Sequence, residues 1–173
     1  EEYAMKAAEN PLVTGIIEKL SVEKNIDMAL KVNPTADKVV AILDDSVTAD
    51  AERKNFYSSA ENYPELEFSE INASELETAR LQQAISKVDD KTILIYIVMS
   101  KDGSGKQYTS DQAVRMIVNY AKVPVYRMVE AGIGDGLLGG NVVSMYKSGE
   151  IAAKMAMDIA NGTDSAEINV VKD

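Results

Sequence analysis

Residues 93–99 read Ile-Leu-Ile-Tyr-Ile-Val-Met, an unbroken apolar run. A strand with one face in water alternates apolar and polar residues, whereas a strand covered by helices on both faces is apolar throughout. This stretch therefore predicts a central strand of a parallel sheet that lies between two layers of helices.

Three further apolar stretches predict neighbouring strands, at residues 39–43, 66–71 and 123–129. Between them apolar residues recur at helical spacing, and a leading helix through Leu30 stops near Asn33-Pro34. Segments 74–77 and 109–112 match a capping box, which marks a helix start. The order of a helix, three strand-helix pairs and a strand predicts an α/β fold with a doubly wound parallel sheet and three α/β/α layers.

Composition excludes several kinds of chemistry. The 173 residues contain no histidine, cysteine or tryptophan, which rules out Ser-His-Asp triads, cysteine nucleophiles, histidine-ligated zinc and disulfides. A formal net charge of -10 argues against a nucleic-acid partner. No stretch reaches the ~20 apolar residues of a membrane span, and the start at Glu1 lacks a signal-peptide pattern. We interpret the chain as a mature or excised fragment whose targeting and anchoring segments lie elsewhere.

Two glycine-rich stretches resemble nucleotide motifs only in part. Residues 132–140 follow the fourth strand rather than the first, so a hinge or cleft loop is favoured over a dinucleotide site. Residues 103–106 lack the spacing of a phosphate-binding loop. Asp44-Asp45 at a strand end could hold Mg²⁺ as in a receiver domain, although capping of the next helix by Asp45 or Ser46 is favoured.

The last predicted helix, residues 150–161, carries more apolar surface than one sheet requires. Two explanations remain open. The helix is either wedged deeply within this domain or packed against a lobe or subunit outside this sequence.

In its order of motifs the chain resembles the C-terminal portion of a type I periplasmic-binding-protein-like domain of the ABC transporter substrate-binding branch. Residues 14–18, 26–34 and 42–46 carry the resemblance in the first half. Residues 123–126, the glycine loop through Gly140, and 149–162 carry it in the second. The versions most similar to it are extracellular sensor domains of bacterial histidine kinases or diguanylate cyclases.

The resemblance implies a division of the chain into four parts. Residues 1–20 would link from a missing N-terminal lobe, and 21–140 would form the α/β C-terminal lobe. Residues 141–164 would return toward the missing lobe, and 165–173 would supply the last strand, with Ile168 to Val171 extended. A fragment on its own would hide the 149–161 helix by forming a homodimer.

The implied function is sensing of a small polar solute between two lobes, outside the cytoplasmic membrane and without a cofactor, a metal or catalysis by this chain. An amino acid would suit helix N-termini and nearby carboxylates together. The alternatives are the solute-binding subunit of an ABC importer and a Mg²⁺-dependent phosphoryl acceptor. Solute contacts are expected from the loops after the strands, at the following residues: Asp45, Ser46, Ser100, Lys101, Asp102, Glu130, Gly134 and Asp135.

Overall fold

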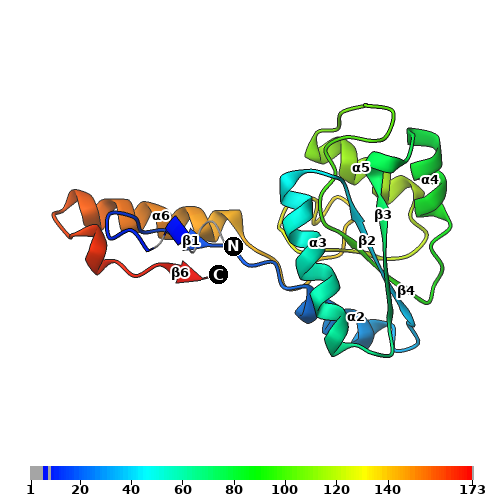
Figure 1. Cartoon of the computed structure of the whole chain (residues 1–173), viewed down its shortest axis with the longest axis horizontal. Coiled ribbons are helices and arrows are strands. Elements are labelled where there is room, and N and C mark those ends of the chain that lie inside the picture. The colour runs from blue at the N-terminus through cyan, green and yellow to red at the C-terminus, as the bar shows by residue number, and fades with distance from the viewer. Residues whose placement is uncertain (1–5, 8, 173) are drawn as a thin grey trace. The chain divides into compact units, whose positions relative to one another are not determined.

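A computed structural model describes residues 6, 7 and 9–172. The chain divides into two compact units (Figure 1). Residues 21–142 form the first, which we call the sheet unit. The residues up to Leu20, together with those from Val143 onward, form the second, which we call the terminal unit.

The sheet unit is built on a fully parallel four-stranded sheet in the order β3-β2-β4-β5. Its strands are β2 (Lys38–Leu43), β3 (Glu67–Asn72), β4 (Thr92–Tyr96) and β5 (Val125–Arg127). Every residue of β4 is buried, as expected for a central strand covered on both faces. The predicted α/β fold with a doubly wound parallel sheet is confirmed.

Helices cover both faces of this sheet. They are α2 (Val22–Val32), α3 (Val47–Ser59), α4 (Thr78–Ser86) and α5 (Ser110–Tyr120), with short 3-10 turns η1 (Ala60–Asn62) and η2 (Ala73–Glu75). Helices α2 and α3 pack together on one side, and α4 and α5 pack together on the other (Figure 1). The unit therefore has three layers, with the sheet in the middle.

A hydrophobic core lies between β4 and the α4–α5 layer. Leu94 of β4 packs with Leu81 and Ile85 of α4 and with Ile117 of α5, and all four side chains are completely buried. Burial of each aliphatic side chain of this size contributes roughly 1.5–3 kcal/mol. This layer fixes the direction in which the loop after β4 leaves the sheet.

Three details of the sheet unit differ from the prediction. The strand expected at 123–129 covers only Val125–Arg127. The expected strand at 93–99 ends at Tyr96, and the buried residues that follow begin the loop toward the site. The expected capping box at 74–77 is wrong, because Ser74 lies in η2 and α4 starts only at Thr78. Glu77, the N-cap of α4, makes no capping hydrogen bond. The capping box at Thr109–Gln112 is confirmed.

The terminal unit contains a two-stranded parallel sheet of β1 (Ile16–Ile17) and β6 (Val171–Lys172), the helix α6 (Met145–Ala160) and the turn η3 (Ser165–Glu167). Strand β6 begins at Val171, whereas the last strand was expected at residues 168–171. Helix α6 starts before the expected Glu150, since the Ser144 hydroxyl accepts a hydrogen bond from the Lys147 N–H. No helix among the described residues combines the length and hydropathy needed to cross a membrane.

Candidate functional site

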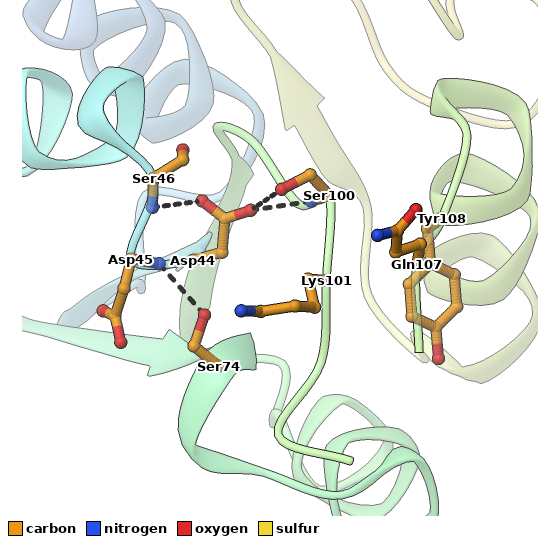
Figure 2. Close-up of a pocket in the computed structure, with 8 residues that line it drawn as sticks. All are labelled: Asp44, Asp45, Ser46, Ser74, Ser100, Lys101, Gln107 and Tyr108. Atoms are coloured by element: carbon orange, nitrogen blue, oxygen red, sulfur yellow. Dashed lines mark hydrogen bonds between the residues drawn. The ribbon is translucent and has the colours of Figure 1, made fainter. Parts of the chain in front are cut away.

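The sheet unit has a cavity where its chain reverses direction. From β2 the chain moves outward to β3, and it then returns to add β4 and β5 on the other side. The loops after β2 and β4 therefore diverge at the carboxyl edge, where α/β sheets of this kind place their ligands. The cavity there has a volume of about 370 Å³. Figure 2 shows its lining residues: Asp44, Asp45, Ser46, Ser74, Ser100, Lys101, Gln107 and Tyr108.

Asp44 ties the two diverging loops together at the back of the cavity. Its side chain is almost completely buried, and Oδ1 accepts the Ser46 N–H at 3.0 Å. Oδ2 accepts the Ser100 N–H at 2.7 Å and the Ser100 hydroxyl at 2.6 Å. Burial alone would raise the pKa of this carboxyl, but the hydrogen bonds from Ser100 and Ser46 outweigh it and lower the pKa. Asp44 is therefore an ionised structural anchor.

The Asp45 carboxylate is engaged at the rim of the cavity. Its Oδ1 accepts hydrogen bonds from Asn72 at 2.8 Å and from the Arg53 guanidinium at 3.3 Å. Arg53 also binds both carboxylate oxygens of Glu70 through Nε, at 3.1 and 3.0 Å. The side chain of Asp45 keeps 57% of its surface exposed, and it shares Arg53 with Glu70 and with Asp50, which binds the guanidinium at 2.6 Å.

Hydrogen-bond donors and a cation face the cavity instead. Ser46 caps α3, with its hydroxyl oxygen accepting the Ala49 N–H at 3.2 Å, so the positive end of the helix dipole lies here. The Ser74 hydroxyl accepts the Asp45 N–H at 3.1 Å, which leaves its proton available as a donor. The Lys101 ammonium points toward Ser74 (Figure 2), and no described carboxylate lies within ion-pair distance of it. The cavity therefore offers hydrogen-bond donors and one cation beside the carboxylates of Asp44 and Asp45.

Asp102 lies behind the cavity wall and is completely buried. Its Oδ1 accepts the N–H and hydroxyl of Ser104 and the Lys106 N–H, while Oδ2 accepts the hydroxyls of Thr78 and Tyr108. Its role is to fold residues 101–107 into a tight excursion, in which Lys101 bridges to Gln107. This geometry gives Asp102 no surface for the solute contact expected of it.

Arg127 fastens the loop after β4 to the loop after β5. Its guanidinium donates to the carbonyls of Tyr96 and Ile97, and Nε donates to the Ala131 carbonyl at 3.3 Å. It also stacks over the Tyr96 ring at 4.0 Å from the ring centroid. Burial lowers the pKa of this guanidinium, but a group with so high a starting value stays charged.

Apart from Asp102, which is buried behind the cavity wall, the structure divides the expected site residues into two groups. Asp45, Ser46, Ser100 and Lys101 line the cavity together. The residues expected from the glycine loop, Glu130, Gly134 and Asp135, are not among its lining residues. Asp135 lines a separate cavity of about 230 Å³ beside α5. The loop adopts positive φ at Gly132, Gly134 and Gly136, as expected for glycines in a tight loop.

Besides Asp44, which the sequence indicated only as a possible Mg²⁺ ligand, three lining residues were not expected from the sequence. Ser74 follows β3, and its assignment to a capping box hid its position at the carboxyl edge. Gln107 and Tyr108 return beside the site only because the 101–107 excursion folds back, where the Tyr108 N–H binds the Ser100 carbonyl at 2.8 Å. The short spacing of Gly103 and Gly105 was the available signal for that turn.

The geometry does not favour the phosphoryl-acceptor alternative. Both Asp44 oxygens accept hydrogen bonds from the protein, and the Asp45 carboxylate is paired with Arg53. Across residues 6, 7 and 9–172, no three acidic side chains are grouped to hold a metal ion. A Mg²⁺ site needs several free oxygen ligands.

Comparison with protein families identifies the chain. The profile described as ABC transporter substrate binding protein matches residues 4–173. The chain belongs to this family. The resemblance inferred from the motifs is thereby confirmed at the level of the family. No curated protein matches the chain significantly.

Solved structures show a similar fold. A conserved domain protein from Vibrio cholerae matches with a TM-score of 0.67 at 16% sequence identity. The match covers 100% of this chain and 58% of the Vibrio cholerae chain. The ABC domain from Streptococcus pneumoniae in complex with L-Trp matches with a TM-score of 0.66 at 15% sequence identity. This match covers 93% of this chain and 54% of the other. An open, ligand-free substrate-binding protein from Clostridium difficile matches with a TM-score of 0.69 at 17% sequence identity. This match covers 99% of this chain and 58% of the other. The chain thus spans less than three fifths of each of these proteins.

Proposed function

We propose that the chain is part of a solute-binding domain, and that its cavity between the loops after β2 and β4 holds an anionic group of a small polar solute. The observation that carries this proposal is the Lys101 ammonium at a cavity whose own carboxylates are already engaged. The family assignment supports solute binding in general.

An amino acid is the solute class that we propose. Its carboxylate would lie near Lys101 and the N-terminus of α3, where the helix dipole and the Ser46 and Ser74 hydroxyls favour negative charge. The similar Streptococcus pneumoniae structure holds L-Trp, which supports this class. With Asp102 buried and Asp45 paired, we propose no residue of this chain as the partner of the amino group.

The experiment is isothermal titration calorimetry with the twenty amino acids and with the amines that lack their carboxylates. We expect saturable binding of at least one amino acid and none of its matching amine. Lys101→Met should weaken binding at least tenfold, because it removes the ammonium and keeps most of the side-chain volume. Lys122→Met, at an exposed lysine after α5, is the matched control and should bind like the unaltered chain. Equal binding by both variants would exclude Lys101 from the site.

For the biological setting, we propose an extracellular or periplasmic sensor domain anchored through segments outside this sequence. The resemblance to sensor domains of histidine kinases and diguanylate cyclases supports this setting, whereas the family description favours an importer subunit. Sequencing the complete gene distinguishes them. A kinase or cyclase domain on the same chain supports the sensor, and a chain that ends after two lobes supports the importer.

A further inference from the structure

Asn25 of α2 occupies an unusual position in the sheet unit. It is a polar residue with no exposed surface, and its side-chain amide nitrogen donates two hydrogen bonds. One goes to the Ser21 carbonyl at 2.8 Å and the other to the Asn141 carbonyl at 2.8 Å. The two acceptors are 120 residues apart in sequence but are joined through one side chain.

Those two carbonyls mark the places where the chain passes between the two units. The sheet unit begins at Ser21 and ends at Val142, one residue beyond Asn141. Apart from these two connections, no covalent link joins the units, because the chain has no cysteine. Ser21 is the N-cap of α2, and its carbonyl also accepts the Asn25 backbone N–H at 3.4 Å. The side-chain bond to Asn141 therefore ties the second connection to the start of α2, and so to the first.

The Asn25 side-chain amide is packed closely against Gly140. A Cβ added at Gly140 would lie 2.0 Å from the Asn25 Oδ1 and 2.7 Å from the Met28 Cε, so a side chain at Gly140 would displace the amide. The orientation of the amide is also determined, since its reversal would place an oxygen against two carbonyl oxygens. In this orientation Oδ1 is buried and accepts no hydrogen bond from any described residue.

A buried carbonyl oxygen without a donor is unfavourable. The stability of the sheet unit alone therefore does not explain an asparagine at this position. Its hydrogen bond to the Asn141 carbonyl supplies the explanation, because it holds the second connecting segment against the start of α2, where the first one ends.

We propose that Asn25 is a positioning residue that fastens the two connecting segments together and so restricts how far the two units move relative to each other. Without the amide, the segment at Asn141 would bend independently of the start of α2, and the range of arrangements of the units would widen. The proposal concerns the chain without solute, so it does not depend on the proposed function.

Pulsed electron paramagnetic resonance on the full chain tests this directly. Because the chain lacks cysteine, spin labels can be attached uniquely at Lys54→Cys in α3 and Lys154→Cys in α6, both exposed positions, and an excess of unlabelled chain removes distances between two copies. Asn25→Leu keeps the side-chain volume but removes both donors, and we expect it to widen the distribution of label distances at least twofold. Met28→Leu, which repacks the same neighbourhood without touching the amide, is the matched control and should leave the width unchanged.

Gly140→Ala is a second variant, which displaces the amide without replacing it. We expect it to widen the distribution as Asn25→Leu does, with an unchanged far-ultraviolet circular dichroism spectrum. Unchanged widths in both variants would overturn the proposal. Loss of the folded spectrum in both would also overturn it, because Asn25 would then be a residue needed to fold the sheet unit. If only Asn25→Leu fails to fold, the width measured for Gly140→Ala decides.

Discussion

At the scale of single residues, the candidate site depends on two buried carboxylates that do not face a solute. Asp44 joins the loops after β2 and β4, and Asp102 holds the excursion that brings Gln107 and Tyr108 to the cavity. Each accepts hydrogen bonds on both oxygens, and hydrogen bonds to charged groups contribute roughly 1.5–3 kcal/mol each. The shape of the cavity should therefore be sensitive to either residue.

Asp102→Asn should destabilise the sheet unit by roughly 2–3 kcal/mol at pH 7, because the amide places a donor against groups that now donate. Burial would raise the pKa of Asp102, but hydrogen bonds led by those of Ser104 and Thr78 lower it below the unfolded value of 3.8. Its contribution is therefore complete above about pH 4 and decreases as the pH falls toward the folded pKa. Urea unfolding at pH 7 and pH 3 should show a smaller difference between variant and unaltered chain at pH 3.

The control for this prediction is Asp90→Asn, at an exposed carboxylate in the turn before β4. It should change the free energy of unfolding by less than about 0.5 kcal/mol at either pH. A destabilisation by Asp102→Asn that grows at pH 3 would contradict the stabilising role given to the ionised carboxylate.

The sequence predicted part of the site at this scale because ligand loops follow strands in parallel sheets. That rule located Asp45, Ser46, Ser100 and Lys101. The rule could not show that the Asp102 side chain turns inward. Its burial depends on Thr78, which is distant in sequence, and on Tyr108, which lies beyond a turn. The rule also treated the glycine loop as equivalent to the others, although β5 is an edge strand that does not adjoin β2.

At the scale of elements, the helix starts show which sequence signals determine local structure. Thr109 and Gln112 bind each other's backbone N–H groups and start α5, as the pattern predicted. The similar pattern at Ser74 failed, because the Ser74 hydroxyl is instead used by the Asp45 N–H from a neighbouring loop. A capping pattern cannot reveal a competing tertiary donor. Likewise β1 and β6, at two residues each, are too short to produce a sequence pattern.

Helix capping gives a prediction with opposite signs at two helices. Thr109→Ala should destabilise the sheet unit by about 1 kcal/mol, because α5 loses a capping acceptor. Glu77→Ser should stabilise it by up to about 1 kcal/mol, since the N-cap of α4 has an extended backbone but no capping hydrogen bond. Midpoints of urea unfolding measure both. Stabilisation by Thr109→Ala would contradict this account of α5.

Glycine substitutions give a second prediction at this scale. Gly149 lies within α6 with open space at its Cβ position, so Gly149→Ala should stabilise the terminal unit by about 0.8–1 kcal/mol. Gly136 has φ of +106°, and an added Cβ would lie 2.6 Å from a Val118 methyl. Gly136→Ala should therefore destabilise the sheet unit. Thermal unfolding of the two variants would reveal the contrast, and equal effects would contradict it.

At the scale of the whole molecule, the terminal unit exposes much apolar surface. Of the residues in α6 only Met155 is buried, whereas Met145, Tyr146, Met157 and Ile159 are exposed by 54%, 80%, 64% and 43%. The sequence predicted this excess of apolar residues, and the explanation by deep burial within this domain is not supported. Their number on one helix suggests a covering partner.

We propose that the isolated chain covers α6 by pairing with a second copy. Light scattering should show a mass that rises from that of the 18.8 kDa chain toward twice that value as concentration increases. Met157→Lys places a charge on the exposed face and should shift this transition to higher concentration. Lys154→Arg, on the same helix, keeps the charge and should have no effect. A strictly monomeric chain at high concentration would contradict this pairing.

The central claim is that the sheet unit binds a solute at the cavity beside Lys101, and nuclear magnetic resonance tests it most directly. Backbone amides of the chain labelled with ¹⁵N would be followed while each amino acid is added in turn. We predict saturable shifts for at least one amino acid, centred on Ser46, Ser74, Ser100 and Lys101 and absent with its matching amine. Shifts confined to other residues, or none across the panel, would contradict the claim.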